Sequence, residues 1–150
     1  MEWKMTIDGT LHAHNENEKK FYNFIAHALK DKFVQRIETT TGSGVPDVYI
    51  EPLLCDPWFE LKIVLKQGVL LRREQYAWAM RYAIRTTSRV NILALDMKEE
   101  KVSWWLAGAT AFSCHLDVEP YGKKYVRILN QPYKVCHQDS ISFRHMLGCE

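Results

Sequence analysis

The sequence has none of the features that mark a membrane-spanning or repeat protein. No apolar run approaches the roughly 18 residues that a membrane-spanning helix needs, and the first twenty residues contain no long apolar segment typical of a secretion signal. We therefore expect a cytoplasmic protein with no membrane among its partners. No internal repeat, low-complexity tract or Pro/Ser-rich linker interrupts the 150 residues, which predicts a single domain over residues 1–150.

Cysteine is also scarce. The four cysteines show no CxxC spacing and are too few for a disulfide framework, so we expect free thiols at Cys55, Cys114, Cys136 and Cys149. Two of them directly precede a histidine. Adjacent residues on a strand point to opposite faces, so such a pair does not bind one zinc ion together.

No charge sign dominates the whole chain, since 20 Lys and Arg residues stand against 18 Asp and Glu residues, for a net charge of +2. The basic residues are nevertheless concentrated. From Lys62 to Arg89 there are seven basic residues and one acid, a net charge of +6, so the rest of the chain is negative. This distribution is typical of a phosphate-binding face. We predict nucleic-acid contacts at Lys66, Arg72, Arg73, Arg81 and Arg85; for each arginine taken singly, a solvated helix face is the alternative.

Apolar periodicity predicts helices over residues 17–31 and 69–85, the second carrying a polar residue, Gln75, on its apolar stripe. Alternation and β-branched content predict strands over 33–39, 45–51, 58–65, 89–96, 101–108 and 124–130. The final twenty residues remain unassigned. The order helix, three strands, helix, strand, followed by a β-rich extension, predicts an α/β domain with a mixed central sheet flanked by helices.

Charged residues stand in the middle of the hairpin predicted for residues 45–65. Glu60 and Lys62 are two apart on a strand and share one face, and Asp47 begins the partner strand. Buried charges are costly unless they are paired or bind a metal. Mg²⁺ prefers oxygen ligands, which Asp47, Glu60 and the backbone carbonyl of Leu61 could supply, with Lys62 placed to act on an attacking water. The alternative is a structural salt bridge between Lys62 and one of the acids.

The same residues resemble the PD-(D/E)xK nuclease superfamily, with "VPD" at 45–47 and "ELK" at 60–62. The resemblance implies a restriction-endonuclease-like core of order αβββαβ. It also implies that Asp47 and Glu60 bind Mg²⁺, or Mn²⁺ in its place, and that Lys62 is catalytic in hydrolysing a DNA phosphodiester. In this superfamily the first helix often adds a glutamate near the metal. Glu16 and Glu18 are both candidates, and Glu18 is chosen because it shares a face with the apolar residues of its helix.

Downstream, "GVLLRREQYAW" is similar to the segment after the catalytic lysine in virus-type replication-repair (VRR-NUC) nucleases, where Gln75 matches a glutamine at the site and in contact with nucleic acid. Small Holliday junction resolvases have a similar size and element order. The resemblance covers about residues 16–96, and residues 97–150 form the C-terminal extension. It implies a metal-dependent DNA endonuclease, selective for branched or flapped DNA and of phage type, acting in the host cytoplasm.

Two further points follow from the resemblance. Resolvases cut with two active sites, so a homodimer is expected by analogy. The alternative function is a catalytically silent module of the nuclease fold that binds nucleic acid or a protein partner. The intact Asp47, Glu60 and Lys62 argue against that alternative.

Overall fold

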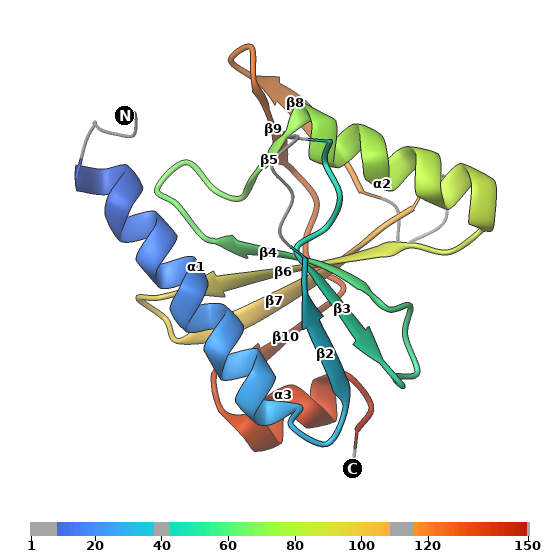
Figure 1. Cartoon of the computed structure of the whole chain (residues 1–150). Coiled ribbons are helices and arrows are strands. Elements are labelled where there is room, and N and C mark those ends of the chain that lie inside the picture. The colour runs from blue at the N-terminus through green and yellow to red at the C-terminus, as the bar shows by residue number, and fades with distance from the viewer. Residues whose placement is uncertain (1–8, 38–42, 109–115, 150) are drawn as a thin grey trace.

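A computed structural model describes residues 9–37, 43–108 and 116–149, with side chains from residue 16 onward. Within this part, three helices and nine strands follow one another (Figure 1). They are α1 (Gly9–Ala28), β2 (Phe33–Arg36), β3 (Val48–Glu51), β4 (Trp58–Ile63), β5 (Leu70–Arg72), α2 (Arg73–Thr86), β6 (Val90–Asp96), β7 (Lys101–Ala107), β8 (Val118–Tyr121), β9 (Tyr125–Ile128), β10 (Lys134–His137) and α3 (Ser140–Met146).

Six strands form one mixed sheet in the order β10-β7-β6-β4-β3-β2, and three form a smaller sheet in the order β5-β9-β8. In the large sheet β4 and β6 run parallel, and every other neighbouring pair is antiparallel. The parallel pair requires a crossover, which α2 supplies between β4 and β6. The predicted mixed α/β architecture and the hairpin of β3 and β4 are confirmed.

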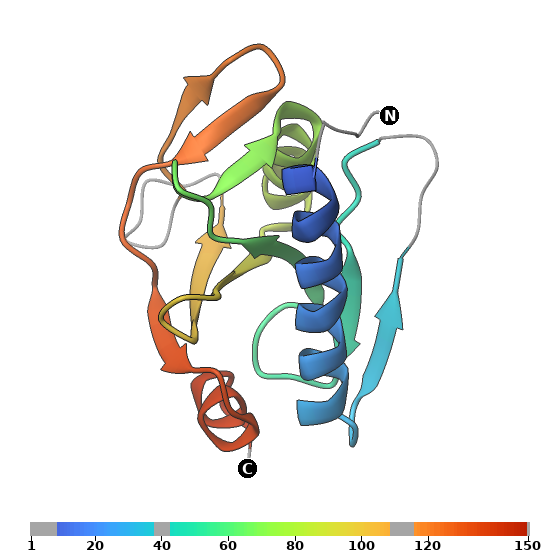
Figure 2. The same cartoon turned by 90° about the vertical axis from the view of Figure 1, so that its left-hand side faces the viewer.

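Both faces of the large sheet are buried, and the alternation along β6 shows it. Leu93 and Leu95 point into a core that α1 and α3 cover, whereas Val90, Ile92 and Ala94 point into a second core beside α2. α1 contributes Phe21, Ile25 and Ala28 to the first core, at the spacing of one helical face. α1 also lies against α3, and the side view shows α3 beside the C-terminal end of α1 (Figure 2).

Two adjacent tryptophans on β7 illustrate the same point. Trp104 belongs to the core of α1 and α3, and Trp105 belongs to the core beside α2. Strand alternation separates the two rings, as expected, but neither is exposed because each face of the sheet has its own cover.

The second helix begins later than predicted. Residues 70–72 form β5, because Leu70, Leu71 and Arg72 pair with Arg127, Val126 and Tyr125 of β9. α2 therefore starts at Arg73, and the small sheet of β5, β9 and β8 lies beside its first turns (Figure 1).

Three other differences concern the ends and the extension. α1 begins at Gly9 and ends at Ala28, and the strand predicted to reach residue 39 ends at Arg36. β8, which the sequence did not predict, pairs with β9. The unassigned final residues form β10 and α3. Among the described residues no helix is long and apolar enough to cross a membrane, and Cys55, Cys136 and Cys149 are free thiols, whereas Cys114 lies outside the described residues.

Candidate active site

The candidate site lies where β3 and β4 separate. The two strands pair only at Val48 with Phe59 and at Tyr49 with Trp58, whereas β4 remains paired with β6 as far as Ile63. From residue 60 onward, the edge of β4 that faces β3 therefore has no strand beside it. A gap between diverging strands is a place where polar side chains can enter a sheet.

Asp47 fills the start of this gap. Its Oδ2 accepts a hydrogen bond from the backbone N–H of Leu61, at 3.0 Å. The N–H and C=O of one strand residue leave the strand on the same side, so the Leu61 carbonyl is directed toward the Asp47 side as well. Asp47 thus replaces the missing strand partner and brings a carboxylate next to a backbone oxygen.

Glu60, Lys62 and Gln75 form a hydrogen-bonded network on the α2 side of the sheet. The Oε1 atom of Gln75 accepts from Lys62 Nζ at 2.9 Å and from the backbone N–H of Arg72 at 2.9 Å. The Nε2 atom of Gln75 donates to Glu60 Oε2 at 2.8 Å. Two donors at Oε1 fix the orientation of the amide, because only the NH₂ group can then face the carboxylate. Lys62 Nζ also lies 3.5 Å from Glu60 Oε2.

The network is buried. Glu60 is 3% exposed and Gln75 is 7% exposed. Gln75 was predicted to contact nucleic acid, but its side chain lies beneath the surface and links α2 to the acid and the lysine of β4. Its Oε1 also caps the first turn of α2 through the Arg72 N–H.

Burial raises the pKa of Glu60 well above its ordinary value of 4.5. The Lys62 ammonium opposes this shift, whereas the negative charges of Asp47 and Glu18 and a hydrogen bond with Asp47 raise the pKa further. The carboxyl groups of Asp47 and Glu60 therefore lie near each other, and like charges in such a pair repel. The influence of Glu18 on Glu60 places its charge near this pair, whereas Glu16 is exposed.

Gly44 sets the path of the segment that carries Asp47. Its φ is +86°, and a Cβ atom built there would lie 2.1 Å from the carbonyl oxygen of Glu74 and 3.0 Å from the backbone nitrogen of Gln75. A side chain is therefore excluded on two grounds, backbone conformation and space. Gly44 allows the loop before Asp47 to lie directly on the first turn of α2. Asp47 and Gln75 are thereby brought to the same end of that helix.

The oxygen atoms at the gap are chemically suited to a hard divalent cation. Asp47, Glu60 and the Leu61 carbonyl offer only oxygen ligands, the kind that Mg²⁺ prefers. Among the described residues, however, no group of three or more His, Cys, Asp or Glu side chains is arranged to hold a metal ion. Water or a substrate phosphate would have to complete the coordination.

The predicted basic contacts lie in three places. At the start of α2, Arg72 forms an ion pair with Glu74 at 3.2 Å, and Arg73 donates to the carbonyl of Gly122 at 3.1 Å. Arg81 and Arg85 are exposed on the later turns of α2, about 12 and 18 Å from the helix start by the helical rise. Lys66 is exposed in the turn between β4 and β5.

Sequence reasoning missed a cluster of aromatic rings on the α2 side of the sheet, the aromatic cluster of Tyr49, Trp58, Trp78 and Tyr82. Adjacent ring centroids in this order lie 5.1, 5.6 and 5.3 Å apart, and the last two rings are stacked at 14°. All four residues are partly exposed. Trp58 is two residues from Glu60, so the cluster continues the same face as the acids.

Sequence spacing could have revealed the cluster in part. Trp78 and Tyr82 are four apart on a helix, and Tyr49 and Trp58 are direct partners in the hairpin. Trp78 and Tyr82 also line a surface hollow of about 350 Å³ with Arg81, Arg85 and Thr86. Aromatic rings and guanidinium groups therefore meet on the later turns of α2.

No family model, curated protein or solved structure matches the chain. The geometry of the residues themselves must therefore support any statement about function.

Proposed function

We propose that the chain is a metal-dependent DNA endonuclease of the PD-(D/E)xK type. One observation supports it most: the carboxyl groups of Asp47 and Glu60 meet beside the ammonium group of Lys62, in a gap between two strands of the sheet. A structural salt bridge needs one acid and one base. A second acid beside the first adds repulsion between like charges, and a bound cation would offset that repulsion.

The residues divide the chemistry among them. Asp47, Glu60 and the Leu61 carbonyl would hold Mg²⁺, or Mn²⁺ in its place, with Glu18 adding negative charge nearby. When bound, the metal ion supplies Lewis-acid polarisation of the phosphate and of the attacking water. In the overall reaction water attacks phosphorus, one P–O ester bond breaks, and the leaving oxygen takes up a proton.

Lys62 acts on the reacting groups through its ammonium hydrogens. Gln75 holds Nζ at 2.9 Å, so the group is oriented before substrate arrives. From this position the ammonium donates to the attacking water or to the phosphate oxygen on which charge develops. Gln75 is a positioning residue, since it orients both Lys62 and Glu60 and is buried beneath them.

The surface around the site fits a nucleic acid. Arg81 and Arg85 carry positive charge beside the stacked rings of Trp78 and Tyr82. Exposed aromatic rings can stack on unpaired bases, and arginines contact phosphates. This arrangement supports flapped DNA, or branched DNA with a single-stranded arm, as the substrate, because both offer unpaired bases next to a duplex.

A second candidate is a nuclease-fold module that binds nucleic acid or a protein partner without cutting. It is favoured by the lack, among the described residues, of a group of three metal-binding side chains. Metal binding distinguishes the two candidates directly. We expect Mg²⁺ to raise the melting temperature of the wild-type protein, because it binds only the folded state, and to have no such effect on Asp47→Asn.

The activity test uses labelled four-way junction, flap, single-stranded and duplex DNA, and a matched RNA, with Mg²⁺, Mn²⁺ or EDTA. We expect cleavage of branched or flapped DNA with either metal, and a loss of about 10²–10⁴-fold in Asp47→Ala, Glu60→Gln and Lys62→Ala. Glu99→Gln, an exposed acid in the turn after β6, is the control and should cleave as the wild type does. Unchanged cleavage by Asp47→Ala, or no cleavage of any substrate, would refute the catalytic proposal.

Resolvase-type cutting needs two sites, so the assembly state belongs to the same proposal. A mass measurement in solution, with and without a four-way junction, tests it. A monomer under both conditions would rule out paired cutting of a junction and leave flapped DNA as the proposed substrate.

A further inference from the structure

The hairpin of β8 and β9 projects from the end of the molecule opposite α3 (Figure 1 and Figure 2). Its turn comprises residues 122–124, and Gly122 there has a φ of +67°, a conformation that glycine adopts without strain. The next two residues, Lys123 and Lys124, are exposed, and Tyr125 is 38% exposed. The hairpin therefore carries two ammonium groups at its tip, and the candidate site uses neither of them.

Hydrogen bonds attach the hairpin tip to the first residue of α2. The backbone N–H of Arg73 donates to the carbonyl of Lys124 at 2.9 Å, and the Arg73 guanidinium donates to the carbonyl of Gly122 at 3.1 Å. Strand pairing continues this contact, since Arg72 of β5 lies opposite Tyr125 of β9. The position of the tip relative to α2 is therefore set by the fold before any partner binds.

The same first turn of α2 belongs to the candidate site. The Oε1 atom of Gln75 accepts from the backbone N–H of Arg72 and from Lys62 Nζ, both at 2.9 Å. Arg72, which bonds to this network, is followed directly by Arg73, which bonds to the hairpin tip. The aromatic cluster begins at Trp78, one turn further along α2. Along this helix, the candidate site therefore lies between the hairpin and the aromatic cluster.

Cationic side chains around the hairpin outnumber the acids that neutralise them. Arg72 is paired with Glu74, and Arg127 of β9 is paired with Glu119 of β8. The turn between β4 and β5 lies against the same strand, because Arg127 also donates to the carbonyl of Gln67 at 3.3 Å. Within the described ranges, the exposed cations of this surface that form no ion pair are Lys66, Arg73, Lys123 and Lys124. The surface between the hairpin and the start of α2 is therefore strongly positive.

We propose that the hairpin of β8 and β9 holds the duplex arm of the DNA substrate, with Lys123 and Lys124 on its phosphates. Lysine and tyrosine side chains are common donors to the phosphate backbone, and the major groove of a duplex is wide enough for a two-stranded β-ribbon. The inference rests on the proposed nuclease function. It adds the side of the site on which the duplex lies: the paired arm at the hairpin, and the unpaired strand at the aromatic cluster.

Fluorescence anisotropy in EDTA measures DNA binding without cleavage. The association constant for a labelled duplex is determined at several salt concentrations, for the wild type and for a variant that combines Lys123→Gln and Lys124→Gln. Each phosphate contact contributes about 0.9 to the slope of the logarithm of this constant against the logarithm of the salt concentration, so we expect the variant's plot to be shallower by about 1.8. The slope for a single-stranded oligonucleotide should not change, because the aromatic cluster holds that strand.

Matched variants separate this contact from a general effect of charge. Lys30→Gln combined with Lys32→Gln removes the same charge just after α1, which ends on the opposite side of the molecule from the hairpin (Figure 2). This control should bind the duplex with the wild-type slope. Both lysines of the hairpin are exposed, and glutamine keeps the Lys124 backbone carbonyl that Arg73 binds, so the test variant should fold. In an Asp47→Ala background the two hairpin substitutions should have the same effect, because the contact needs no metal.

Three results would overturn the inference. The first is that the wild type does not bind the duplex, or binds it with the same slope as the hairpin variant. The second is that the slope for the single-stranded oligonucleotide falls equally, because the hairpin would then not select the duplex arm. The third is that the Lys30 and Lys32 control loses as much slope as the hairpin variant.

Failure of the nuclease proposal would look different. A protein that cleaves no DNA but shows the expected change in slope would retain the hairpin contact without the catalytic function. Cleavage of flapped DNA by the wild type, together with an unchanged slope in the hairpin variant, would leave the nuclease proposal standing and remove the hairpin contact alone.

Discussion

Replacing Gln75 by leucine tests whether the network at the candidate site holds its charges in place. The substitution removes the acceptor of Lys62 Nζ and of the Arg72 N–H, and the donor to Glu60. Hydrogen bonds to charged groups are each worth about 1.5–3 kcal/mol. Here two such bonds disappear from a site whose Lys62 and Glu60 side chains are 12% and 4% exposed, so water replaces little of what is lost.

Part of the stabilisation lost with these hydrogen bonds is recovered. Lys62 Nζ already lies 3.5 Å from Glu60 Oε2 and can close to a direct ion pair. We therefore expect a net destabilisation of about 2–3 kcal/mol. Urea unfolding followed by tryptophan fluorescence measures it in EDTA. With a slope of about 1–3 kcal/mol per molar urea, the midpoint should fall by about 0.7–3 M.

The control for this prediction is Gln67→Leu, which changes an exposed glutamine in the turn after β4. It should shift the free energy of unfolding by less than about 0.5 kcal/mol. A Gln75→Leu protein as stable as Gln67→Leu would show that the amide does not hold the two charges. The idea that Gln75 positions Lys62 for catalysis would then lose its basis.

Three further predictions concern the loop, the buried acid and the basic helix. Gly44→Ala should destabilise the protein by more than about 2 kcal/mol in thermal unfolding, whereas Gly122→Ala, at φ +67° with nothing within 4 Å, should cost only the backbone strain of about 1–2 kcal/mol; equal effects would contradict the close approach to α2. In metal-free protein, burial raises the pKa of Glu60 above 4.5, so the folded state holds its proton more tightly than the unfolded state and stability falls as the pH rises from 4.5 through the raised pKa. The free energy of unfolding of Glu60→Gln, measured with urea, should therefore rise relative to that of the wild type over that pH range. A difference between the two proteins that does not change with pH would refute the pKa shift. Replacing Arg81 and Arg85 together by glutamine should make the plot of the logarithm of the association constant for duplex DNA against the logarithm of the salt concentration shallower by about 1.8. An unchanged slope would exclude both arginines from the phosphate contacts.

The acidic hairpin could be predicted because its information is local. Glu60 and Lys62 are two apart, so any strand places them on one face. The position of Asp47 was harder to predict. It depends on where β3 leaves β4, and the register of these two strands sets that point. Gln75 was visible as a polar residue on an apolar stripe, but its partners were not.

Other features depend on residues far away in the sequence. Leu70–Arg72 reads equally well as the start of a helix, and pairing with β9, more than fifty residues later, makes it a strand. The burial of Trp104 also depends on a distant segment, because α3 supplies part of the core that contains it. The short segments after residue 130 have too little periodicity to be assigned alone.

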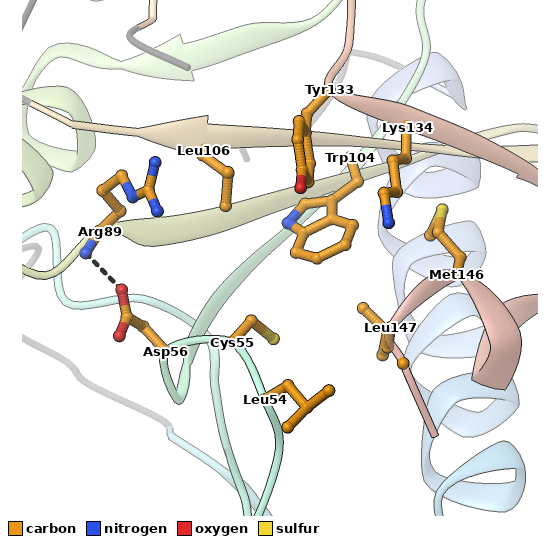
Figure 3. Close-up of a pocket in the computed structure, with 11 residues that line it drawn as sticks. Leu54, Cys55, Asp56, Arg89, Trp104, Leu106, Tyr133, Lys134, Met146 and Leu147 are labelled. Atoms are coloured by element: carbon orange, nitrogen blue, oxygen red, sulfur yellow. Dashed lines mark hydrogen bonds between the residues drawn. The ribbon is translucent and has the colours of Figure 1, made fainter. Parts of the chain in front are cut away.

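The candidate site and a hollow on the opposite face of the sheet differ in the same respect. The candidate site takes its acids and lysine from one hairpin and Gln75 from the first turn of the next helix, so a short motif can represent them. The hollow takes Asp56, Arg89, Trp104 and Lys134 from four separate segments, and no spacing relates them (Figure 3). Arg89 shows the consequence. The sequence counts it as part of a basic stretch, yet β6 begins directly after it and carries its side chain to the opposite face of the sheet from Lys62. A charge count along the chain cannot assign a cation to a site until the strand that holds it has a known face.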